Sequence, residues 1–419
     1  MNTRELIAVT GMGLITSLGN TLEETWQGMI HGRSGVKTIS RFPAEELPTQ
    51  FAAYVDIFDT PKIMPYERAL HLGRSAMNEA LSHAHLSPGD MDRTRLFLAT
   101  STAELDWTAR LAQRHPELLD KSDNAEEIRA RLIDVTDQAY AGNVLSHELG
   151  LKLPPVTVTT ACASGASAIQ LAQESLLAGR VQKAIVVAAD SSVFPEGILR
   201  FALLSALSKR NDNPTGACRP FSRDRGGFVM GEAGGALTLE RYSDAIERGA
   251  SIYGFILGCG DATDNFHRTR SHPSGDTILN SMQSALNHAQ LSPDQIDYVN
   301  AHGTGTSEND KMEALGVTRL FGNSERIPPI SANKSMIGHT LIAAGAVEAI
   351  ITLKTLSSGI LPPTINYQTP DPEIMLDVVP NTARPCETKY ALSNSFGFGG
   401  QNVTLVLARA DTFSEETRS

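Results

Sequence analysis

The sequence predicts an α/β protein built from two similar halves, in which helices cover mostly parallel or mixed sheets. Segments typical of strands and helices alternate along nearly all of the 419 residues. A nine-residue motif also recurs about half a chain length apart: residues 80–88 read ALSHAHLSP and residues 285–293 read ALNHAQLSP. Each copy ends a helical pattern and precedes a short turn and a strand, which favours a duplicated unit.

Apolar and β-branched runs predict the strands of both halves. In the first half they lie at residues 6–13, 95–101, 156–161 and 184–190. In the second half they lie at residues 296–302, 327–333, 390–395 and 402–408. Segments with helical spacing lie between these runs. We therefore expect an N-terminal half over residues 1–250, a C-terminal half over residues 251–410 and a polar tail over residues 411–419.

Composition and charge restrict the class of protein and its partners. Hydrophobic residues make up 41% of the chain, and the formal net charge of −11 disfavours electrostatic binding to nucleic acid. The four cysteines lie far apart without a CxxC pair, so neither a disulfide framework nor a zinc ribbon is expected. No apolar run approaches the roughly 20 residues of a membrane span, and residues 6–18 lack the features of a signal peptide. We expect a cytoplasmic protein.

Cys162 lies within TVTTACASGASAIQLAQ (residues 157–173), between an extended run and an apolar pattern with helical spacing that stops at Gly179. The cysteine is therefore expected at a helix N-terminus, where unpaired N–H groups favour the thiolate. This effect alone is too weak to keep the thiol ionised at pH 7, so a nearby histidine is needed to complete its activation. A buried packing thiol is the alternative.

Three loops of the second half follow predicted strands and carry unusual chemistry. They read NAHGTGTSEND (residues 300–310), NKSMIGH (333–339) and NSFGFGGQN (394–402). Their glycines allow the backbone to approach a ligand closely, and their threonines supply hydroxyl groups. Together with Cys162 these loops predict an active site, although each histidine taken alone is as compatible with a packing role.

Several other kinds of site are not found in the sequence. There is no dinucleotide fingerprint after the first strand, no phosphate-binding GK[ST] loop, no GxSxG elbow and no HExxH helix. Cys162, His302 and His339 are residue types that bind zinc, but their wide spacing does not favour a metal site. No cofactor and no metal are expected.

Read in order, the segments TACASG, RPFSRDRGGFVMGEAGG, NAHGTGT, NKSMIGH and NSFGFGG resemble motifs of the elongating β-ketoacyl-acyl-carrier-protein synthases. The resemblance extends from about residue 6 to residue 408. It implies a thiolase fold, in which two similar α/β halves form a layered α-β-α-β-α core. This implication agrees with the internal repeat.

The resemblance also implies a reaction. An acyl group held on Cys162 as a thioester is condensed with malonyl-acyl carrier protein, and carbon dioxide is released. The reaction belongs to fatty-acid or specialised polyketide or polyene biosynthesis. The implied partners are an acyl carrier protein and either a second copy of the chain or a related subunit. A chain-length-factor-like scaffold subunit and a cysteine hydrolase remain as alternatives, and Cys162 argues against the first.

The same resemblance assigns roles to residues of the motifs. His302 and His339 stabilise the malonyl enolate, and the backbone N–H groups of Cys162 and Phe398 form the oxyanion hole. Lys334 orders the site and has Glu348 as its expected ion-pair partner. Further implied residues are the supporting acids Asp310 and Glu313, the substrate-binding residues Thr269, Thr304, Thr306, Phe396, Glu104 and Asp106, and the carrier-docking residues Lys62, Arg68, Lys209, Arg210 and Arg268. An exposed acidic helix start is the alternative for the two supporting acids.

The chain departs from the family pattern at four positions. Glu104 and Asp106 are acidic where small or apolar residues are usual near the acyl pocket. Either they face the dimer partner and water, or they line a pocket for a polar, unsaturated or short acyl chain, and we expect the second. Ser205 replaces a basic residue that many elongating synthases carry, and Gln401 replaces the usual threonine. These departures predict a dedicated carrier protein and a specialised pathway.

Overall fold

The structure, a computed structural model, describes residues 5–56, 65–101, 111, 114–115, 137–322 and 327–413. Ten strands of this part of the chain form one mixed sheet in the order β10-β9-β13-β14-β8-β1-β7-β6-β4-β5. The strands of the first half are β1 (Ile7–Thr16), β4 (Thr94–Ala99), β5 (Val156–Val158), β6 (Lys183–Asp190) and β7 (Ala233–Arg241). Those of the second half are β8 (Gly254–Thr263), β9 (Tyr298–Asn300), β10 (Ile330–Ser331), β13 (Tyr390–Phe396) and β14 (Gln401–Ala408).

The two halves of this sheet repeat one pairing pattern. β1, β7 and β6 are antiparallel neighbours, and β4 and β5 then continue in parallel with β6. β8, β14 and β13 are likewise antiparallel, and β9 and β10 continue in parallel with β13. The halves join where residues 7–9 of β1 pair with residues 254–256 of β8. The prediction of two similar halves is confirmed.

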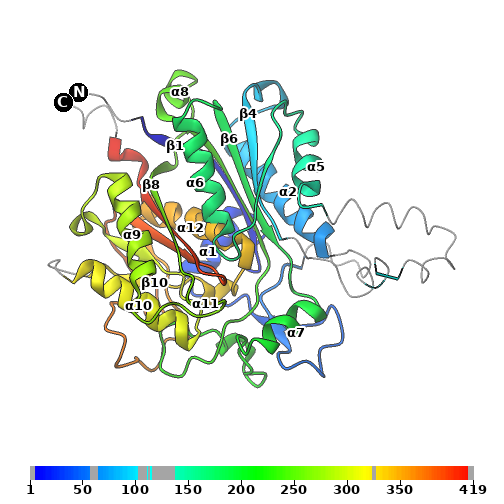
Figure 1. Ribbon diagram of the computed structural model, residues 1–419, viewed down its shortest axis with the longest axis vertical. Helices are drawn as coiled ribbons and strands as arrows, with labels where there is room; N and C mark the ends of the chain where they lie inside the picture. Colours follow the sequence, from blue (N-terminus) through cyan, green and yellow to red (C-terminus); the bar gives the residue numbers. More distant parts are fainter. Residues whose placement is uncertain are drawn as a thin grey trace.

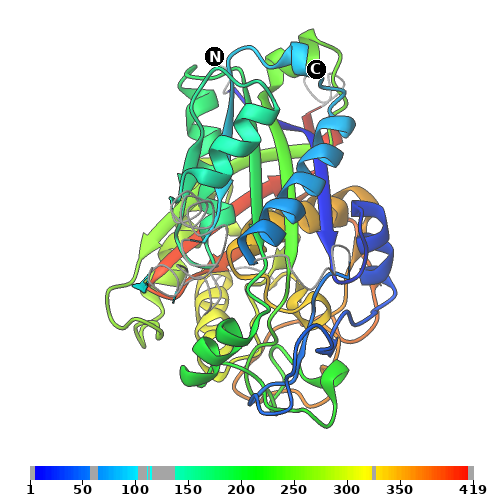
Figure 2. The same ribbon diagram turned by 90° about the vertical axis from the view of Figure 1, so that its right-hand side faces the viewer.

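Helices cover both outer faces of the sheet and also lie between its halves (Figure 1). α6 and α12 pack against each other and against strands of both halves, whereas α2 lies on β1 and β7, and α9 lies on β8 and β14. Figure 2 shows α2 crossing the outer side of the first half. The layers therefore follow the predicted α-β-α-β-α order. The helices are α1 (Leu22–Ile30), α2 (Pro65–His83), α5 (Tyr140–Glu148), α6 (Ser164–Leu177), α7 (Pro195–Leu203), α8 (Tyr242–Glu247), α9 (Asp276–Ala289), α10 (Ser307–Phe321), α11 (Lys334–Ile337) and α12 (Ala344–Ser358).

The repeated sequence motif has the same local structure in both halves. The 3₁₀ turns η1 (Pro88–Asp90) and η4 (Pro293–Gln295) follow α2 and α9 and lead into β4 and β9. The serine before each turn, Ser87 or Ser292, forms a capping box with the third turn residue. The leucine, serine and proline of the motif are therefore shared because each half needs the same helix end and the same cap.

A long apolar stretch in the second half belongs to the core. Leu341–Ser358 has 18 residues and is apolar enough to cross a membrane by length and composition alone. Two charged residues, Glu348 and Lys354, lie within this stretch. The fold buries 83% of it, since α12 lies between the two halves of the sheet. The stretch is therefore the central helix of the core.

The end of the described chain packs on the second half. A 3₁₀ turn, η6 (Ala410–Phe413), follows β14. The ring of Phe413 contacts that of Phe255 edge to face, with ring centroids 5.2 Å apart. Residues 411–413, predicted as part of a polar tail, are therefore packed against the fold, and residues 414–419 lie outside the described part.

Candidate active site

Cys162 lies in a sharp turn between β5 and α6. The strand predicted to reach Ala161 ends at Val158, because Ala161 adopts a left-handed φ of 48° that turns the chain. Ser164 fixes this turn: its hydroxyl accepts a hydrogen bond from Thr160 N at 2.8 Å and donates one to Ala161 O at 2.6 Å. The turn directs Cys162 toward the second half, at the start of α6, where the sequence placed it.

The thiol of Cys162 is buried, with 8% of the residue exposed. Burial raises its pKa to about 12, although the positive charge of Lys334 and the backbone N–H of Phe398 act in the opposite direction. At neutral pH the side chain is therefore a thiol. The helix N-terminus that the sequence predicts follows Cys162, yet burial raises the pKa of the thiol.

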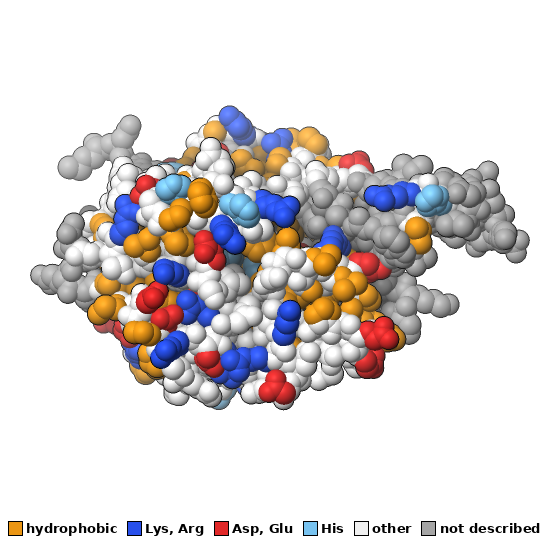
Figure 3. Space-filling view, turned by 60° about the horizontal axis from the view of Figure 1, so that its bottom comes forward, with side chains coloured by type: hydrophobic (Ala, Val, Ile, Leu, Met, Phe, Trp, Pro, Cys, Tyr) orange, Lys and Arg blue, Asp and Glu red, His pale blue; other side chains and the backbone are white. Residues whose placement is uncertain are grey.

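Cys162 opens into a pocket of about 460 Å³ that also receives the loops of the second half. Of the residues named individually in the sequence analysis, ten line this pocket: Cys162, Ser205, Arg268, Thr269, His302, Thr304, Thr306, His339, Phe396 and Phe398. Figure 3 shows the face at the lower end of Figure 1, where α7 and α10 lie, with basic, acidic, histidine and apolar side chains interspersed around a hollow.

His302 and His339 meet in this pocket, with ring centroids 5.2 Å apart and ring planes 83° apart. Nδ1 of His302 lies 3.3 Å from Nζ of Lys334, and Nδ1 of His339 accepts a hydrogen bond from Leu341 N at 3.2 Å. An ammonium group and a backbone N–H can only donate, so both Nδ1 atoms are acceptors and both protons lie on Nε2. Burial and the charge of Lys334 lower the pKa of both rings well below 6.5, so both are neutral at pH 7.

Lys334 and Glu348 form a fully buried ion pair behind His302. Lys334 lies on α11, Glu348 lies on α12, and each side chain is 1% exposed. Nζ of Lys334 donates to Oε1 of Glu348 while it contacts His302. Burial raises the pKa of Glu348, and the adjacent ammonium group opposes that change. The pair therefore holds a positive charge at the back of the imidazole.

Asp310 and Glu313 fix the loop that carries His302. Both side chains are fully buried on α10, so the alternative of an exposed acidic helix start is wrong. Glu313 accepts hydrogen bonds from His302 N and Gly303 N, each at 2.8 Å, and a third from Asn394 at 3.1 Å. Asp310 accepts bonds from Gly305 N at 3.1 Å and from Phe221 N at 2.8 Å. The two carboxylates thus accept hydrogen bonds from backbone N–H groups of a glycine-rich loop that has no strand or helix partner for them.

The turn after β13 brings a second backbone N–H to the thiol. Phe398 N–H contacts the sulfur of Cys162 and lowers the pKa of the thiol. Gly397 lies directly against the Cys162 turn, since a Cβ there would come within 3.3 Å of Cys162 N and 3.0 Å of Thr160 O. A side chain at this position would push the two loops apart. Glycine therefore allows two backbone segments to converge on one sulfur atom.

The predicted docking and pocket residues have different environments. Arg268 is exposed and lies on the pocket rim. Lys209 is exposed and follows α7 in the sequence. Arg210 is half-buried and pairs with Asp224 at 3.2 Å. Arg68 is 5% exposed and pairs with Glu232, so the prediction that it docks a carrier protein is wrong. Lys62, Glu104 and Asp106 lie outside the described residues.

Sequence reasoning missed several residues around His339. The ring of Phe228 contacts that of His339 edge to face, with centroids 5.2 Å apart, and Leu341 fixes the tautomer of the histidine. Asp190 and Glu232 are fully buried acids next to the same loop. A signal was available for Glu232, because it is a lone acid in the apolar and glycine-rich run FVMGEAGG. In the described residues no group of three or more His, Cys, Asp or Glu side chains is arranged to hold a metal.

Comparisons with known proteins agree with this geometry. A family model described as the β-ketoacyl synthase N-terminal domain matches residues 4–245, and one for the C-terminal domain matches residues 253–368. A 3-oxoacyl-[acyl-carrier-protein] synthase 2 from Synechocystis sp. is 35% identical over 97% of this chain and 98% of its own.

Solved ketosynthases share the architecture. One is the ketosynthase of a type II polyketide synthase in complex with its acyl-carrier protein and bound to a hexaketide, with a TM-score of 0.87 and 30% identity. Another is the ishigamide ketosynthase/chain length factor, with a TM-score of 0.85 and 32% identity. Each comparison covers 97% of this chain and 100% of the solved chain. These likenesses confirm the predicted thiolase fold, and with the family models they show that the chain belongs to the β-ketoacyl synthase family.

Proposed function

We propose that this protein is a condensing acyltransferase, which joins an acyl group held as a thioester on Cys162 to a malonyl group carried by an acyl carrier protein. One observation carries the proposal. Cys162 shares a pocket with two neutral histidines whose Nδ1 atoms both accept hydrogen bonds. Each ring is therefore left with an Nε2–H donor, and two such donors suit an oxygen that becomes negative.

The first step loads the cysteine. Sγ of Cys162 attacks the thioester carbonyl of the acyl carrier, and the backbone N–H groups of Cys162 and Phe398 stabilise the oxyanion. The bond between the acyl carbon and the carrier sulfur breaks, and the carrier thiol leaves with the proton from Cys162. Because burial raises the pKa of Cys162 to about 12, this proton leaves as the new bond forms.

The second step makes the carbon–carbon bond. The malonyl thioester loses carbon dioxide, and the electron pair of the broken bond forms an enolate whose oxygen accepts hydrogen bonds from His302 and His339. The enolate carbon then attacks the acyl carbonyl on Cys162. The bond to sulfur breaks, the thiolate regains a proton, and the β-ketoacyl product leaves on the carrier protein.

The partners follow from how the substrates arrive. Both acyl groups come on a carrier protein, so that protein covers the pocket mouth, where Arg268 and Arg270 are exposed on the rim. Basic residues there suit an acidic carrier despite the negative net charge of the chain. α7 adds exposed leucines, including Leu203 at 85%, beside Phe201, which lines the pocket. The chain acts in the cytoplasm as a dimer, with itself or with a related subunit.

We divide the chain into two halves at about residue 250, and residues of both halves form the site. The first half, over residues 1–250, supplies the nucleophile, and the second, over residues 251–410, supplies the histidine and lysine loops. Fatty-acid or polyketide synthesis provides the substrates. The polar, unsaturated or short acyl chain expected from Glu104 and Asp106 belongs to the proposal as well.

Intact-protein mass spectrometry tests the function. The protein is incubated with acyl-carrier protein and then with malonyl-carrier protein, and the Cys162→Ala variant serves as the control. We expect an acyl adduct on the wild-type chain only, followed by its loss as the β-ketoacyl-carrier product appears. Absence of the adduct would favour the scaffold-subunit alternative. Release of free acid without chain extension would favour a cysteine hydrolase.

A further inference from the structure

The segment of residues 228–232 forms hydrogen bonds with both the backbone N–H and the backbone C=O of His339. His339 N donates to Val229 O at 2.7 Å, and Gly231 N donates to His339 O at 2.9 Å. The backbone of residue 339 thus pairs with this segment as a short parallel bridge to Met230. Since the ring of Phe228 also contacts that of His339, the position of this histidine depends on where the segment lies.

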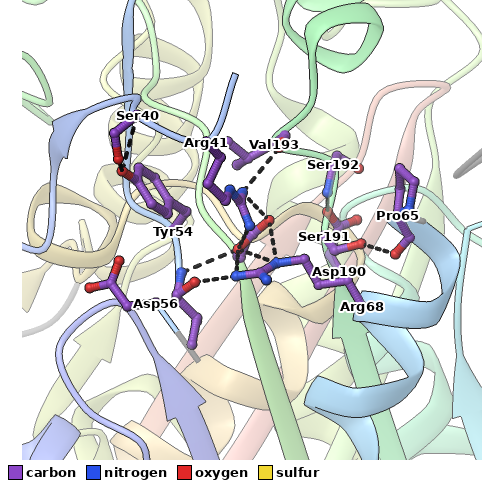
Figure 4. Close-up of polar contacts among 12 residues, drawn as sticks. Ser40, Arg41, Tyr54, Asp56, Pro65, Arg68, Asp190, Ser191, Ser192 and Val193 are labelled. Carbon is purple, nitrogen blue, oxygen red and sulfur yellow. Dashed lines mark hydrogen bonds and ion pairs between the residues drawn. The ribbon is translucent and has the colours of Figure 1, made fainter. Parts of the chain in front are cut away.

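Glu232 is the last residue of this segment and fixes it through ion pairs. The carboxylate is fully buried and accepts hydrogen bonds from Arg41 at 2.7 Å, from Arg68 at 3.1 Å and from Val55 N at 3.2 Å. Arg41 lies outside the helices and Arg68 lies on α2, and Figure 4 shows their guanidinium groups close to each other. The backbone is fixed too, since Glu232 N donates to Ala53 O at 2.9 Å. Two arginines and two backbone groups therefore determine the position of one residue.

A second buried carboxylate holds the other side of the His339 loop. Asp190, at the end of β6, accepts hydrogen bonds from Ser192 N at 2.8 Å and from Ile342 N at 3.4 Å. Ile342 follows Leu341, whose N–H binds Nδ1 of His339. Burial raises the pKa of Asp190 to about 7, and the nearby carboxylate of Glu232 adds to this rise. The positive charges of Arg41 and Arg68 therefore lie beside two buried acids, Glu232 and Asp190, that both support the loop carrying His339.

We propose that Glu232, clamped by Arg41 and Arg68, is a positioning residue for His339, so that its charge controls the release of carbon dioxide more than the acylation of Cys162. This inference rests on the proposed function. Without the charge, two guanidinium groups lose the carboxylate that they share and keep other acceptors such as Val193 O and Val55 O, so the segment of residues 228–232 shifts. The Cys162 turn shares no hydrogen bond with that segment in the described residues, because Ser164 and Thr160 close it locally.

The test measures two rates on the full-length Glu232→Gln variant. Acyl loading of Cys162 is followed by intact mass, and carbon dioxide release from malonyl-carrier protein is followed with labelled substrate. We expect loading within about twofold of wild type and carbon dioxide release lowered by roughly 10–100-fold, since small displacements of a catalytic group have costs of this size. A purely structural role would lower both rates by the same factor.

Glu240→Gln is the matched control. Glu240 lies at the other end of β7, is 1% exposed, and is bound by both ends of the Arg248 guanidinium at 2.6 and 2.7 Å. The same substitution there removes a buried carboxylate from an arginine far from the pocket. We expect the ratio of carbon dioxide release to loading to stay at its wild-type value.

Two results would overturn the inference: an unchanged rate of carbon dioxide release in Glu232→Gln, or an equal loss of both rates. If Glu232→Gln does not fold, Arg41→Lys decides, because it keeps the charge and removes the two-pronged contact with Glu232. A selective loss of carbon dioxide release in that variant supports the inference, and an unchanged ratio refutes it. If the wild-type protein neither loads an acyl group nor releases carbon dioxide, it is the proposed function that fails.

Discussion

The ammonium group of Lys334 lies 3.3 Å from Nδ1 of His302, on the side of the ring that faces away from the pocket. This contact fixes the tautomer of the histidine, because an ammonium group can only donate a hydrogen bond. It also keeps the ring neutral, since the adjacent positive charge and burial both lower its pKa. A single lysine thus determines which proton His302 presents to a substrate.

The ion pair of Lys334 with Glu348 leads to a prediction about stability. Lys334→Met should lower the free energy of unfolding by about 3–5 kcal/mol, because it leaves Glu348 as an unpaired buried charge. The double variant Lys334→Met/Glu348→Leu should recover most of this stability without recovering carbon dioxide release. Denaturant unfolding measures the two changes in stability, and labelled malonyl-carrier protein measures carbon dioxide release. Lys311→Met is the control, since its pair with Glu373 is more than half exposed and its loss should leave the free energy of unfolding nearly unchanged.

The two histidines should serve decarboxylation more than acylation. His302→Ala or His339→Ala removes one Nε2–H donor from the enolate and should lower carbon dioxide release by about 10²–10³-fold. Loading of Cys162 should continue, because its oxyanion donors come from the backbone. Loading and carbon dioxide release are measured on the same preparation. Loss of loading with intact decarboxylation would reverse the two assignments.

The buried thiol predicts a particular pH dependence. The pKa of Cys162 is raised to about 12, so the reactive thiolate is a minor species at neutral pH. As long as the pH is below the pKa, the thiolate fraction rises about tenfold for each unit by which the pH is increased. The rate of alkylation of Cys162 by iodoacetamide should therefore rise continuously between pH 6 and pH 9. Peptide mass spectrometry follows the modification, and the less buried Cys386 is the internal control. A plateau near pH 7 would show that the folded site stabilises the thiolate.

Charge at the pocket rim should affect binding of the carrier protein. Arg268→Ser should raise KM for the carrier several-fold and weaken its dependence on salt, because an exposed rim charge steers an acidic partner. Lys389→Ser is the control, since Lys389 precedes β13 at the end opposite to Phe396, which lines the pocket. Equal KM values for the two variants at low and high salt would contradict a docking role for Arg268.

Local patterns in the sequence were sufficient for the fold class and for the loops that meet in the pocket. The repeat predicted two halves because each half reuses one helix end, one serine cap and one following strand, all of which depend on neighbours in sequence. Gly179 predicted the end of α6 for the same reason: it adopts the left-handed φ of 66° that terminates a helix. The glycine-rich loops around His302 and His339 were likewise recognisable as short motifs.

Only the tertiary structure decided the electrostatic environment of these residues. Sequence position suggested a surface role for Arg68 and an activated thiolate at Cys162, yet packing buries both side chains. Desolvation then determines their chemistry: Arg68 binds Glu232, and the pKa of Cys162 rises instead of falling. Glu232 contacts Arg41 and Arg68 from distant parts of the chain. Such contacts are not encoded in any local pattern, because burial and the meeting of distant charges exist only after the two halves have packed together.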